Sequence, residues 1–247
     1  MATLLLGAAT ATAMPAPAMA IAGGTQVTAH YPWIASIPYQ GRTGPESCGA
    51  SLIAPTWLLT TGYCAVLNLT GRKARLGSNN STAGGKLVGL KRGVRYPESD
   101  PQAQRFKDIG LIELDKPVAN APVKLGTGTE WDNRILRAFG WGRTCFDMDS
   151  CTTVKLRRAD IKVLSESDCQ TSENIPGELF DGILCLQSGK SATCNGDEGG
   201  PVVNMATGKL IGVISLADDQ VDGICGLESS YAARVQPYLA WIKSYTG

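Results

Sequence analysis

The sequence predicts an all-β protein that ends in one α-helix. From Tyr31 onward, short apolar runs alternate with clusters of Gly, Pro, Asn and Ser, which is typical of antiparallel strands in barrels or sandwiches. The clearest runs are residues 33–37, 50–53, 57–60, 109–114, 202–203 and 210–215. Helical spacing of apolar residues occurs only near the end, over residues 235–246. A chain of 247 residues can bury a substantial core as one compact unit.

The first twenty residues are typical of an export signal. Residues 4–13 are apolar and uncharged, Pro15 and Pro17 follow, and the stretch ends in the small-x-small triplet before Ile21. No Lys or Arg precedes the apolar run, which departs from the usual pattern. The run is too short and too interrupted by proline to span a bilayer stably. We therefore expect residues 1–20 to be a signal peptide, residues 21–247 to be secreted to the extracellular space, and no membrane attachment.

Composition narrows the classes of partner and cofactor. The chain has 23 Lys and Arg against 22 Asp and Glu, a net charge of +1, which gives no overall case for a nucleic-acid partner. The eight cysteines show none of the usual zinc spacings and, with an export signal, indicate four disulfides in an oxidising compartment. We expect neither a metal nor another cofactor.

Positive charge is concentrated in the first half of the mature chain. Residues 21–123 carry a net charge of +5 and residues 124–247 a net charge of −4. Two basic clusters lie in the first half: Arg72, Lys73 and Arg75, and Lys91, Arg92 and Arg95. Such clusters are usually a solvated face, and the alternative is a binding site for an acidic protein or polysaccharide.

Three N-glycosylation sequons begin at Asn68, Asn79 and Asn80. They predict surface loops if the chain passes through a eukaryotic secretory pathway. Because the sequons at Asn79 and Asn80 overlap, we do not expect both to be occupied.

The segment Cys194 to Pro201 reads C-N-G-D-E-G-G-P and resembles the nucleophile loop G-D-S-G-G-P of the trypsin-like (chymotrypsin-fold) serine peptidases. The resemblance covers nearly all of residues 21–247. Its further landmarks are C-G-A-S-L-I-A-P-T-W-L-L-T-T-G-Y-C at 48–64, K-D-I-G-L-I at 107–112, G-W-G at 140–142 and Y-L-A-W-I at 238–242. The family's fold is two six-stranded antiparallel β-barrels packed at a cleft. The resemblance therefore implies one barrel at about 31–123, a second at about 124–234, and the C-terminal helix.

The same resemblance assigns the three positions of the family's catalytic triad. Asp108 takes the position of the orienting Asp, Tyr63 that of the His, and Glu198 that of the Ser. A phenol with a pKa of about 10 holds its proton at neutral pH and cannot act as the base. A carboxylate lacks the hydroxyl that acyl transfer requires. His30, the single histidine, lies in a segment that the family places away from the cleft.

These replacements predict a non-catalytic serine protease homologue that acts by binding an extracellular protein, as an inhibitor, a decoy or a cofactor. Two alternatives stay open. One is a serine endopeptidase with at most residual activity. The other is a glycosidase in which Asp108 and Glu198 form a carboxylate pair about 5 to 9.5 Å apart.

The resemblance also implies an oxyanion hole formed by the backbone N–H groups of Gly196 and Glu198. The Glu198 carboxylate would either fold over this hole or point to solvent, and Tyr63 could donate to Asp108 or Glu198. After cleavage before Ile21, the new α-amine would pair with Asp197, as in the family. A buried carboxylate without such a partner is costly.

The family's specificity pocket maps onto Ala192, Ser215, Ala217 and Ser230. Ala192 at the base carries no charge, so selection of Arg or Lys is not expected, and Ser230 in place of a usual Gly should narrow the slot. The adjoining loop contains Asp218, Asp219 and Asp222, which predicts an acidic rim.

The disulfide pairing follows from the resemblance as well, because spacing alone does not fix connectivity. It implies Cys48–Cys64, Cys169–Cys185 and Cys194–Cys225, and leaves Cys145 and Cys151 to pair with each other.

Overall fold

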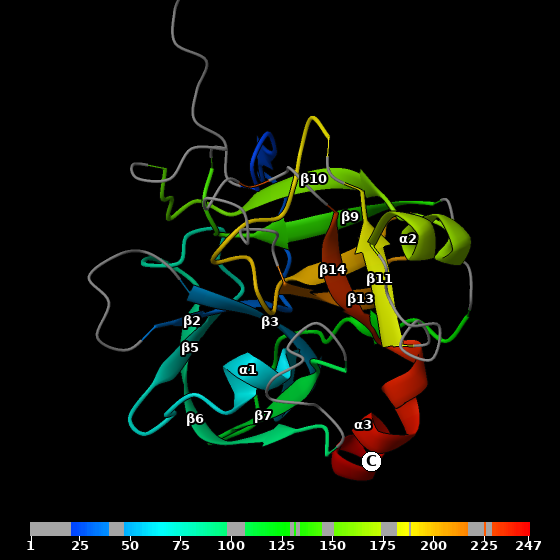
Figure 1. Cartoon of the computed structure of the whole chain (residues 1–247). Coiled ribbons are helices and arrows are strands. Elements are labelled where there is room, and N and C mark those ends of the chain that lie inside the picture. Colours follow the sequence, from blue (N-terminus) through cyan, green and yellow to red (C-terminus); the bar gives the residue numbers. More distant parts are fainter. Residues whose placement is uncertain are drawn as a thin grey trace, which may run out of the picture.

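A computed structural model of the chain describes residues 21–39, 47–97, 107–128, 131, 134–144, 151–173, 182–187, 189–216, 225 and 229–247. Two β-sheets lie against each other, and the C-terminal helix packs at one end of the molecule (Figure 1). All six apolar runs singled out above overlap strands of these sheets. The predicted all-β class is confirmed. The proposed signal peptide lies outside the described residues.

The first sheet is a closed six-stranded barrel in the order β2-β3-β4-β7-β6-β5. Its strands are β2 (Ile34–Pro38), β3 (Ser47–Ala54), β4 (Trp57–Thr60), β5 (Lys73–Leu76), β6 (Lys86–Arg95) and β7 (Gly110–Leu114). Neighbouring strands pair antiparallel throughout. Successive side chains alternate between two buried environments. Ala50 and Leu58 lie in the barrel interior, whereas Ile34 and Leu59 face the second sheet.

The second sheet has eight strands in the described residues. These are β1 (Thr25–Gln26), β8 (Lys124–Leu125), β9 (Ile135–Gly140), β10 (Arg157–Lys162), β11 (Ile183–Leu186), β12 (Pro201–Asn204), β13 (Lys209–Leu216) and β14 (Ser230–Arg234). The order is β1-β10-β9-β12-β13-β14-β11, and β8 pairs with β13 in parallel. The sheet curls instead of closing through full strand pairing. One bridge, Val163 to Leu186, joins the ends of β10 and β11 and completes a ring of six strands. Between β10 and β11 the second sheet is therefore joined by this one bridge and not by a row of paired residues.

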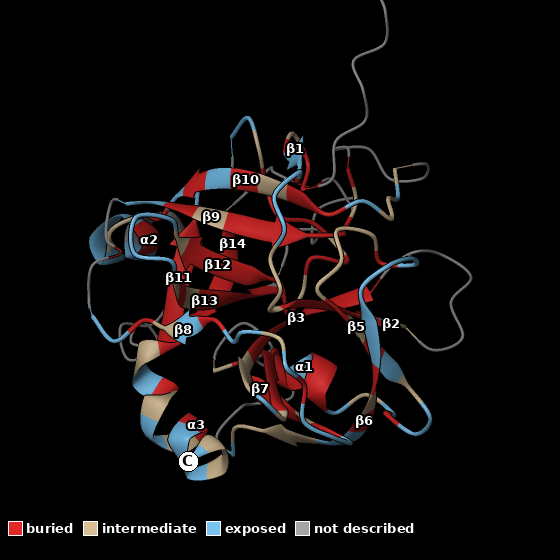
Figure 2. Cartoon of the chain, turned by 180° about the vertical axis from the view of Figure 1, so that it is seen from behind, coloured by how far each residue is buried: buried red, intermediate tan, exposed pale blue. Residues whose placement is uncertain are grey.

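The core between the two sheets is apolar and continuous. Leu111 from β7 meets Phe139 from β9 and Val213 from β13 in one cluster of fully buried side chains. Burial is concentrated where the sheets face each other (Figure 2). Removing such apolar surface from water contributes about 25 cal/mol per Å². This core fixes the relative position of the two sheets.

Short helices complete the fold. They are α1 (Gly62–Ala65), α2 (Glu166–Glu173), the 3₁₀ turn η2 (Gln236–Tyr238) and α3 (Leu239–Thr246). The sequence predicts one helix over 235–246, and the structure divides this stretch into the 3₁₀ turn η2, which has Pro237 in its first turn, and the α-helix α3. Ile242 of α3 is buried in the shared core, and the ring centroids of Trp241 and Tyr96 lie 5.4 Å apart. None of the described helices has the length and hydropathy needed to cross a bilayer.

Three of the four expected disulfides are confirmed: Cys48–Cys64, Cys169–Cys185 and Cys194–Cys225. Cys151 is also disulfide-bonded. Its expected partner Cys145 lies outside the described residues.

Candidate functional site

The loop from Cys194 to Pro201 lies between β11 and β12 of the second sheet and contacts β3 of the first barrel. Its turns are closed by hydrogen bonds from the Asp197 N–H to the Cys194 carbonyl and from the Gly200 N–H to the Asp197 carbonyl, both 2.9 Å. The Glu198 carbonyl accepts a 2.7 Å hydrogen bond from Gly49 of β3. Gly199 has φ +79°, and a Cβ there would lie 2.1 Å from the Gly49 carbonyl oxygen. Glycine is therefore needed at 199 for the loop to approach the first barrel this closely.

The Asp108 carboxylate lies directly before β7 and is 7% exposed. It accepts hydrogen bonds from the Tyr63 backbone N–H at 3.0 Å and from the Ser215 hydroxyl at 2.7 Å. Burial raises the pKa of Asp108, and these hydrogen bonds and the charge of Arg95 oppose that rise. A Cβ at position 62 would lie 3.0 Å from Asp108 Oδ1, so Gly62 leaves room for the carboxylate.

Tyr63 reaches Asp108 through its backbone and not through its hydroxyl. It lies in α1, which Thr61 caps by accepting the Cys64 N–H, and its side chain is 39% exposed. In the described residues the Tyr63 hydroxyl forms no hydrogen bond with Asp108 or Glu198. Of the expected cluster, the structure therefore brings together the backbone of Tyr63 and the carboxylate of Asp108.

The Glu198 carboxylate turns back onto its own loop. Its Oε2 accepts a 2.8 Å hydrogen bond from the backbone N–H of Gly196, and the Tyr39 hydroxyl donates to the same oxygen at 3.4 Å. Gly196 has φ +92°, a conformation that favours glycine. Of the two orientations considered for Glu198, the inward one is found. No signal in the sequence singles out Tyr39, because it lies 159 residues away along the chain.

The Asp197 carboxylate is fully buried beneath the loop. It accepts hydrogen bonds from the N–H groups of Gly142 at 2.8 Å and Cys194 at 2.9 Å. The pKa of Asp197 is raised to about 8, mainly by burial and to a smaller extent by the neighbouring charge of Glu198, while the two hydrogen bonds act in the opposite direction. A positive partner would restore the ionised form at neutral pH.

Ile21 is a buried residue with an unusual backbone conformation. It is fully buried, in the same core cluster as Leu136 and Ala138, and its φ is +41°. A β-branched residue with positive φ is an outlier, because its side chain and backbone clash with the preceding carbonyl. The ion pair between Ile21 and Asp197 stays a prediction.

Of the four residues expected to line the specificity pocket, the structure describes Ala192, Ser215 and Ser230, and all three are buried. Ala192 donates its N–H to the Ala22 carbonyl at 2.9 Å, and Ser215 bonds to Asp108. Ser230 at the start of β14 accepts a 2.7 Å hydrogen bond from the Thr193 hydroxyl. Thr193 adjoins Ala192 in the sequence, and adjacency is the only signal that could have pointed to it. Ala217 and the three acidic residues of the rim lie outside the described residues.

The basic clusters are largely bonded within the chain. Lys91 and Arg92 both bind Glu113, at 2.6 and 2.5 Å, and Arg75 donates to two backbone carbonyls of the loop that follows β5. Arg72 donates to the carbonyls of Pro38 and Asn68. These contacts reduce the number of cations that a ligand could engage.

The sequons lie on loops of the first barrel. Asn68 is exposed, and its side-chain oxygen accepts the Thr70 N–H at 3.1 Å. The Asn79 side chain donates to the carbonyls of Val27 at 3.2 Å and Ala29 at 2.9 Å, so its amide nitrogen already has two partners. Asn80 accepts from the backbone and hydroxyl of Thr82, both at 2.9 Å.

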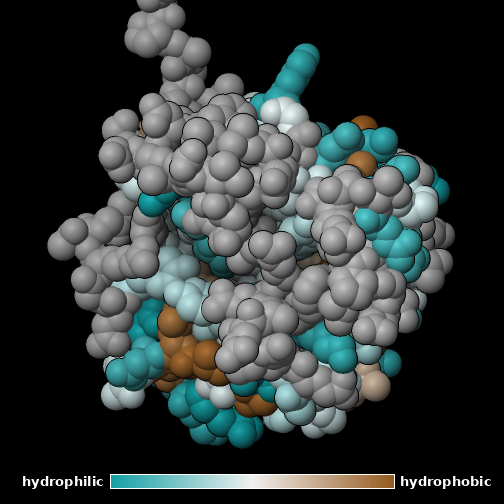
Figure 3. Space-filling view, in the orientation of Figure 1, coloured by the Kyte–Doolittle hydropathy of each residue, from teal (hydrophilic) through white to brown (hydrophobic). Residues whose placement is uncertain are grey.

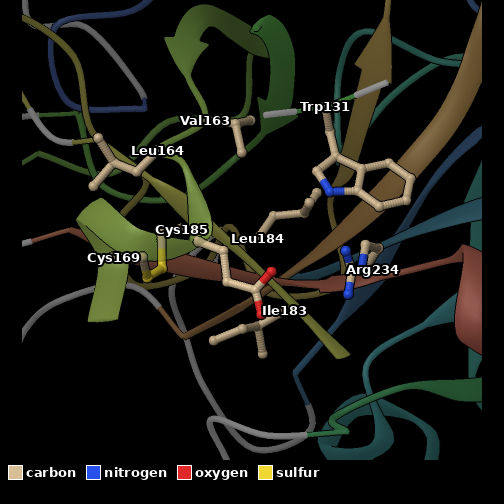
Figure 4. Close-up of a pocket in the computed structure, with 9 residues that line it drawn as sticks. Trp131, Val163, Leu164, Cys169, Ile183, Leu184, Cys185 and Arg234 are labelled. Carbon is tan, nitrogen blue, oxygen red and sulfur yellow. A yellow bond between two sulfur atoms is a disulfide. The ribbon is translucent and has the colours of Figure 1, made fainter. Parts of the chain in front are cut away.

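His30 and a small pocket lie apart from the loop from Cys194 to Pro201. His30 Nε2 is 3.2 Å from the Gly77 carbonyl oxygen on the surface, in agreement with a structural place for this residue. The pocket, in the second sheet, is lined by Val163, Leu184 and the Cys169–Cys185 disulfide, with Arg234 4.5 Å from the Trp131 ring centroid (Figure 4). In the described residues no group of three or more His, Cys, Asp or Glu could hold a metal ion.

Comparison with known proteins places this arrangement in a family. The family model described as Trypsin matches residues 21–242. The chain is 30% identical to Trypsin 5G1 of Aedes aegypti over 239 residues, which cover 92% of this chain and 85% of that protein. It is 28% identical to human Granzyme M over 236 residues, covering 92% and 89%. These matches show that the chain belongs to the trypsin family of serine proteases.

Proposed function

We propose that this trypsin-family chain is secreted and non-catalytic, and that it acts by binding an extracellular protein as an inhibitor, a decoy or a cofactor. The observation that carries the proposal is the hydrogen bond from the Gly196 N–H to the Glu198 carboxylate at the position of the nucleophile. In an active member of the family, the residue at position 198 attacks the substrate carbonyl, and the Gly196 N–H stabilises the oxyanion that forms. Here the Glu198 carboxylate itself accepts the hydrogen bond from that N–H.

Two catalytic roles, the nucleophile and the general base, have no suitable side chain in this protein. A serine nucleophile needs a hydroxyl and a base that accepts its proton. Glu198 provides no hydroxyl, and Tyr63 provides no imidazole at the position of the base. In another serine protease fold, loss of the Ser or the His alone reduces turnover about 10⁶-fold. Loss of both leaves no route to acyl transfer above background.

The glycosidase alternative has less support. Asp108 is almost fully buried, and its two oxygens already accept hydrogen bonds from Ser215 and Tyr63. A carboxylate that protonates or attacks a sugar must face an open groove. Both oxygens of the Asp108 carboxylate instead accept hydrogen bonds from buried groups of the protein.

Surface composition supports a protein partner. A group of apolar atoms lies near α1 on the face drawn in Figure 3. In α1 itself Tyr63 is 39% exposed, and Val66 at its C-terminal end is 55% exposed. Arg72 lies next to these residues, and burial lowers its pKa while the hydroxyls of Tyr39 and Tyr63 oppose that change. Tyr and Arg are enriched among the residues that dominate binding energy at protein interfaces. An acidic ligand at the basic clusters is less well supported, because most of those cations are bonded within the chain.

A panel of fluorogenic peptide substrates tests the proposal. The chain beginning at Ile21 should show no turnover above a buffer blank, whereas Y63H/E198S should regain measurable cleavage on the same scaffold. The triple variant Y63H/E198S/D108N is the matched control and should fall again, because it lacks the orienting carboxylate. Turnover by the natural chain at ordinary rates would support the rival endopeptidase function and refute the proposal.

A further inference from the structure

An open polar groove lies between the N-terminal segment and the loop that follows β5. Its volume is about 520 Å³. A cavity of about 150 Å³ can hold a benzene ring, so this groove has room for more than one six-membered ring. The described residues that line it are Gln26, Val27, Thr28, Ser78, Asn79, Asn80, Ala83, Gly84 and Lys155.

Hydrogen bonds hold the walls of the groove together. The Asn79 side-chain nitrogen donates to the carbonyls of Val27 at 3.2 Å and Ala29 at 2.9 Å. The Leu156 N–H donates to the Asn79 carbonyl at 2.7 Å, and the Leu156 carbonyl accepts the Val27 N–H at 2.9 Å. The N-terminal segment, the loop after β5 and the segment before β10 are therefore joined here, and a ligand would meet a groove that is already formed.

The side chains of the groove suit a ligand that is rich in hydroxyl and amide groups. Three amides and two hydroxyls line it, together with the ammonium group of Lys155. Amides and hydroxyls both donate and accept hydrogen bonds, as the groups of a sugar do. The described lining offers no aromatic ring on which a free sugar could stack. A covalent tether would compensate by raising the effective concentration of the sugar.

Asn80 provides a point for such a tether. It lines the groove and begins a sequon that ends at Thr82. Its side-chain oxygen accepts hydrogen bonds from the Thr82 N–H and the Thr82 hydroxyl, both at 2.9 Å. Within the described part of the chain its side-chain nitrogen donates to no protein group, so this nitrogen is open to substitution. Asn79 differs, because a sugar on its nitrogen would replace a proton that binds the N-terminal segment.

We propose that Asn80, and not Asn79, carries an N-linked glycan whose innermost sugars lie in this groove. In the attachment step the Asn80 amide nitrogen loses a proton and bonds to C1 of a lipid-linked sugar. The bond from C1 to the lipid pyrophosphate breaks, and the pyrophosphate leaves with the electron pair. The inference rests on the proposed function only in requiring secretion, because such glycans belong to secreted chains.

The first experiment maps the glycan. The chain from Ile21 is secreted from cultured eukaryotic cells behind a heterologous leader, and its glycopeptides are identified by mass spectrometry. S81A removes only the Asn79 sequon, and T82A removes only the Asn80 sequon. The natural chain and S81A should each carry one glycan on Asn80, and secreted T82A should carry none in this loop. A glycan on Asn79 of folded T82A, or an unmodified loop in the natural chain, would overturn the inference.

The heterologous leader keeps this result separate from the proposed function. If residues 1–20 fail to deliver the chain to the medium, that failure counts against secretion in the proposed function and leaves the mapping unaffected.

The second experiment tests whether the sugars lie in the groove. Melting temperatures are compared for the natural chain and T82A, made in the same cells and also in the bacterial periplasm, where no such glycan is added. The bacterial pair measures the effect of the substitution alone. The glycan should add about 2 to 4 °C to the difference, the shift that a net gain of one hydrogen bond gives a protein of this size.

Two lysine variants show whether this gain comes from the groove. K155A removes a donor that lines the groove and should reduce the gain. K162A removes an exposed lysine of β10 that is not part of the lining and should leave the gain unchanged. Equal differences between the natural chain and T82A in both hosts would overturn the placement of the sugars, and so would equal gains in K155A and K162A.

Discussion

The buried Asp197 carboxylate makes the stability of the protein depend on how its N-terminus is produced. With residues before Ile21 still attached, no α-amine is available to Asp197, and burial raises its pKa to about 8. An exposed Asp has a pKa of about 3.9. The folded state therefore holds a proton on Asp197 between about pH 4 and pH 8, where the unfolded state does not.

The sign and size of the effect follow from this difference. The stabilisation is fully present below about pH 4 and is lost as the pH rises toward 8, because the unfolded state then binds fewer protons. Each pKa unit corresponds to about 1.4 kcal/mol, so a shift of about four units predicts a loss of roughly 5 to 6 kcal/mol in the free energy of unfolding. A free α-amine at Ile21 would pair with the ionised carboxylate and remove most of this loss.

Urea denaturation between pH 4 and pH 8 measures the difference. A chain that begins at Ile21 is compared with one that keeps residues 18–20, and D197N in both forms is the control. The extended chain should lose stability steeply with rising pH, the mature chain only weakly, and the two D197N chains should run parallel. Equal pH slopes for the extended and mature chains with Asp197 intact would refute the reasoning.

Three further predictions concern individual hydrogen bonds. E198A removes a carboxylate bonded to a backbone N–H and should lower the free energy of unfolding by about 1 kcal/mol in urea denaturation, while E198Q should lower it less. S215A leaves Asp108 buried with one partner fewer and should cost about 1 to 3 kcal/mol by the same measurement; a value within error of zero would show that water replaces the hydroxyl. N79A breaks two bonds to the N-terminal segment and should lower the melting temperature by several degrees more than N80A, whose bonds are local; equal shifts would contradict this.

The strand pattern of the first barrel was only partly visible in the sequence. In β3 and β4 nearly every residue is buried, since one face fills the barrel and the other meets the second sheet, so these strands read as apolar runs. The opposite case is β6, where Lys86, Lys91 and Arg92 are exposed, and no apolar run marks this ten-residue strand. Its pairing with β5 and β7 is set by neighbours and not by its own composition.

The site was predictable at the level of motifs and not of contacts. The sequence placed Asp108, Asp197 and Glu198 at their positions because each lies in a short pattern with fixed neighbours. The partners of Glu198 and Ser230 could not be predicted in this way. The Tyr39 hydroxyl and the Thr193 hydroxyl reach them across 159 and 37 residues of chain, and only the packing of the sheets brings such groups within 3.5 Å.

Covalent labelling at residue 198 tests the central claim most directly. The natural chain beginning at Ile21 and Y63H/E198S are each incubated with a fluorophosphonate, and intact mass is measured. The account predicts no adduct on the natural chain, because no hydroxyl is presented to the phosphorus, and one adduct per molecule on the double variant. Stoichiometric labelling of the natural chain within the loop from Cys194 to Pro201 would contradict it.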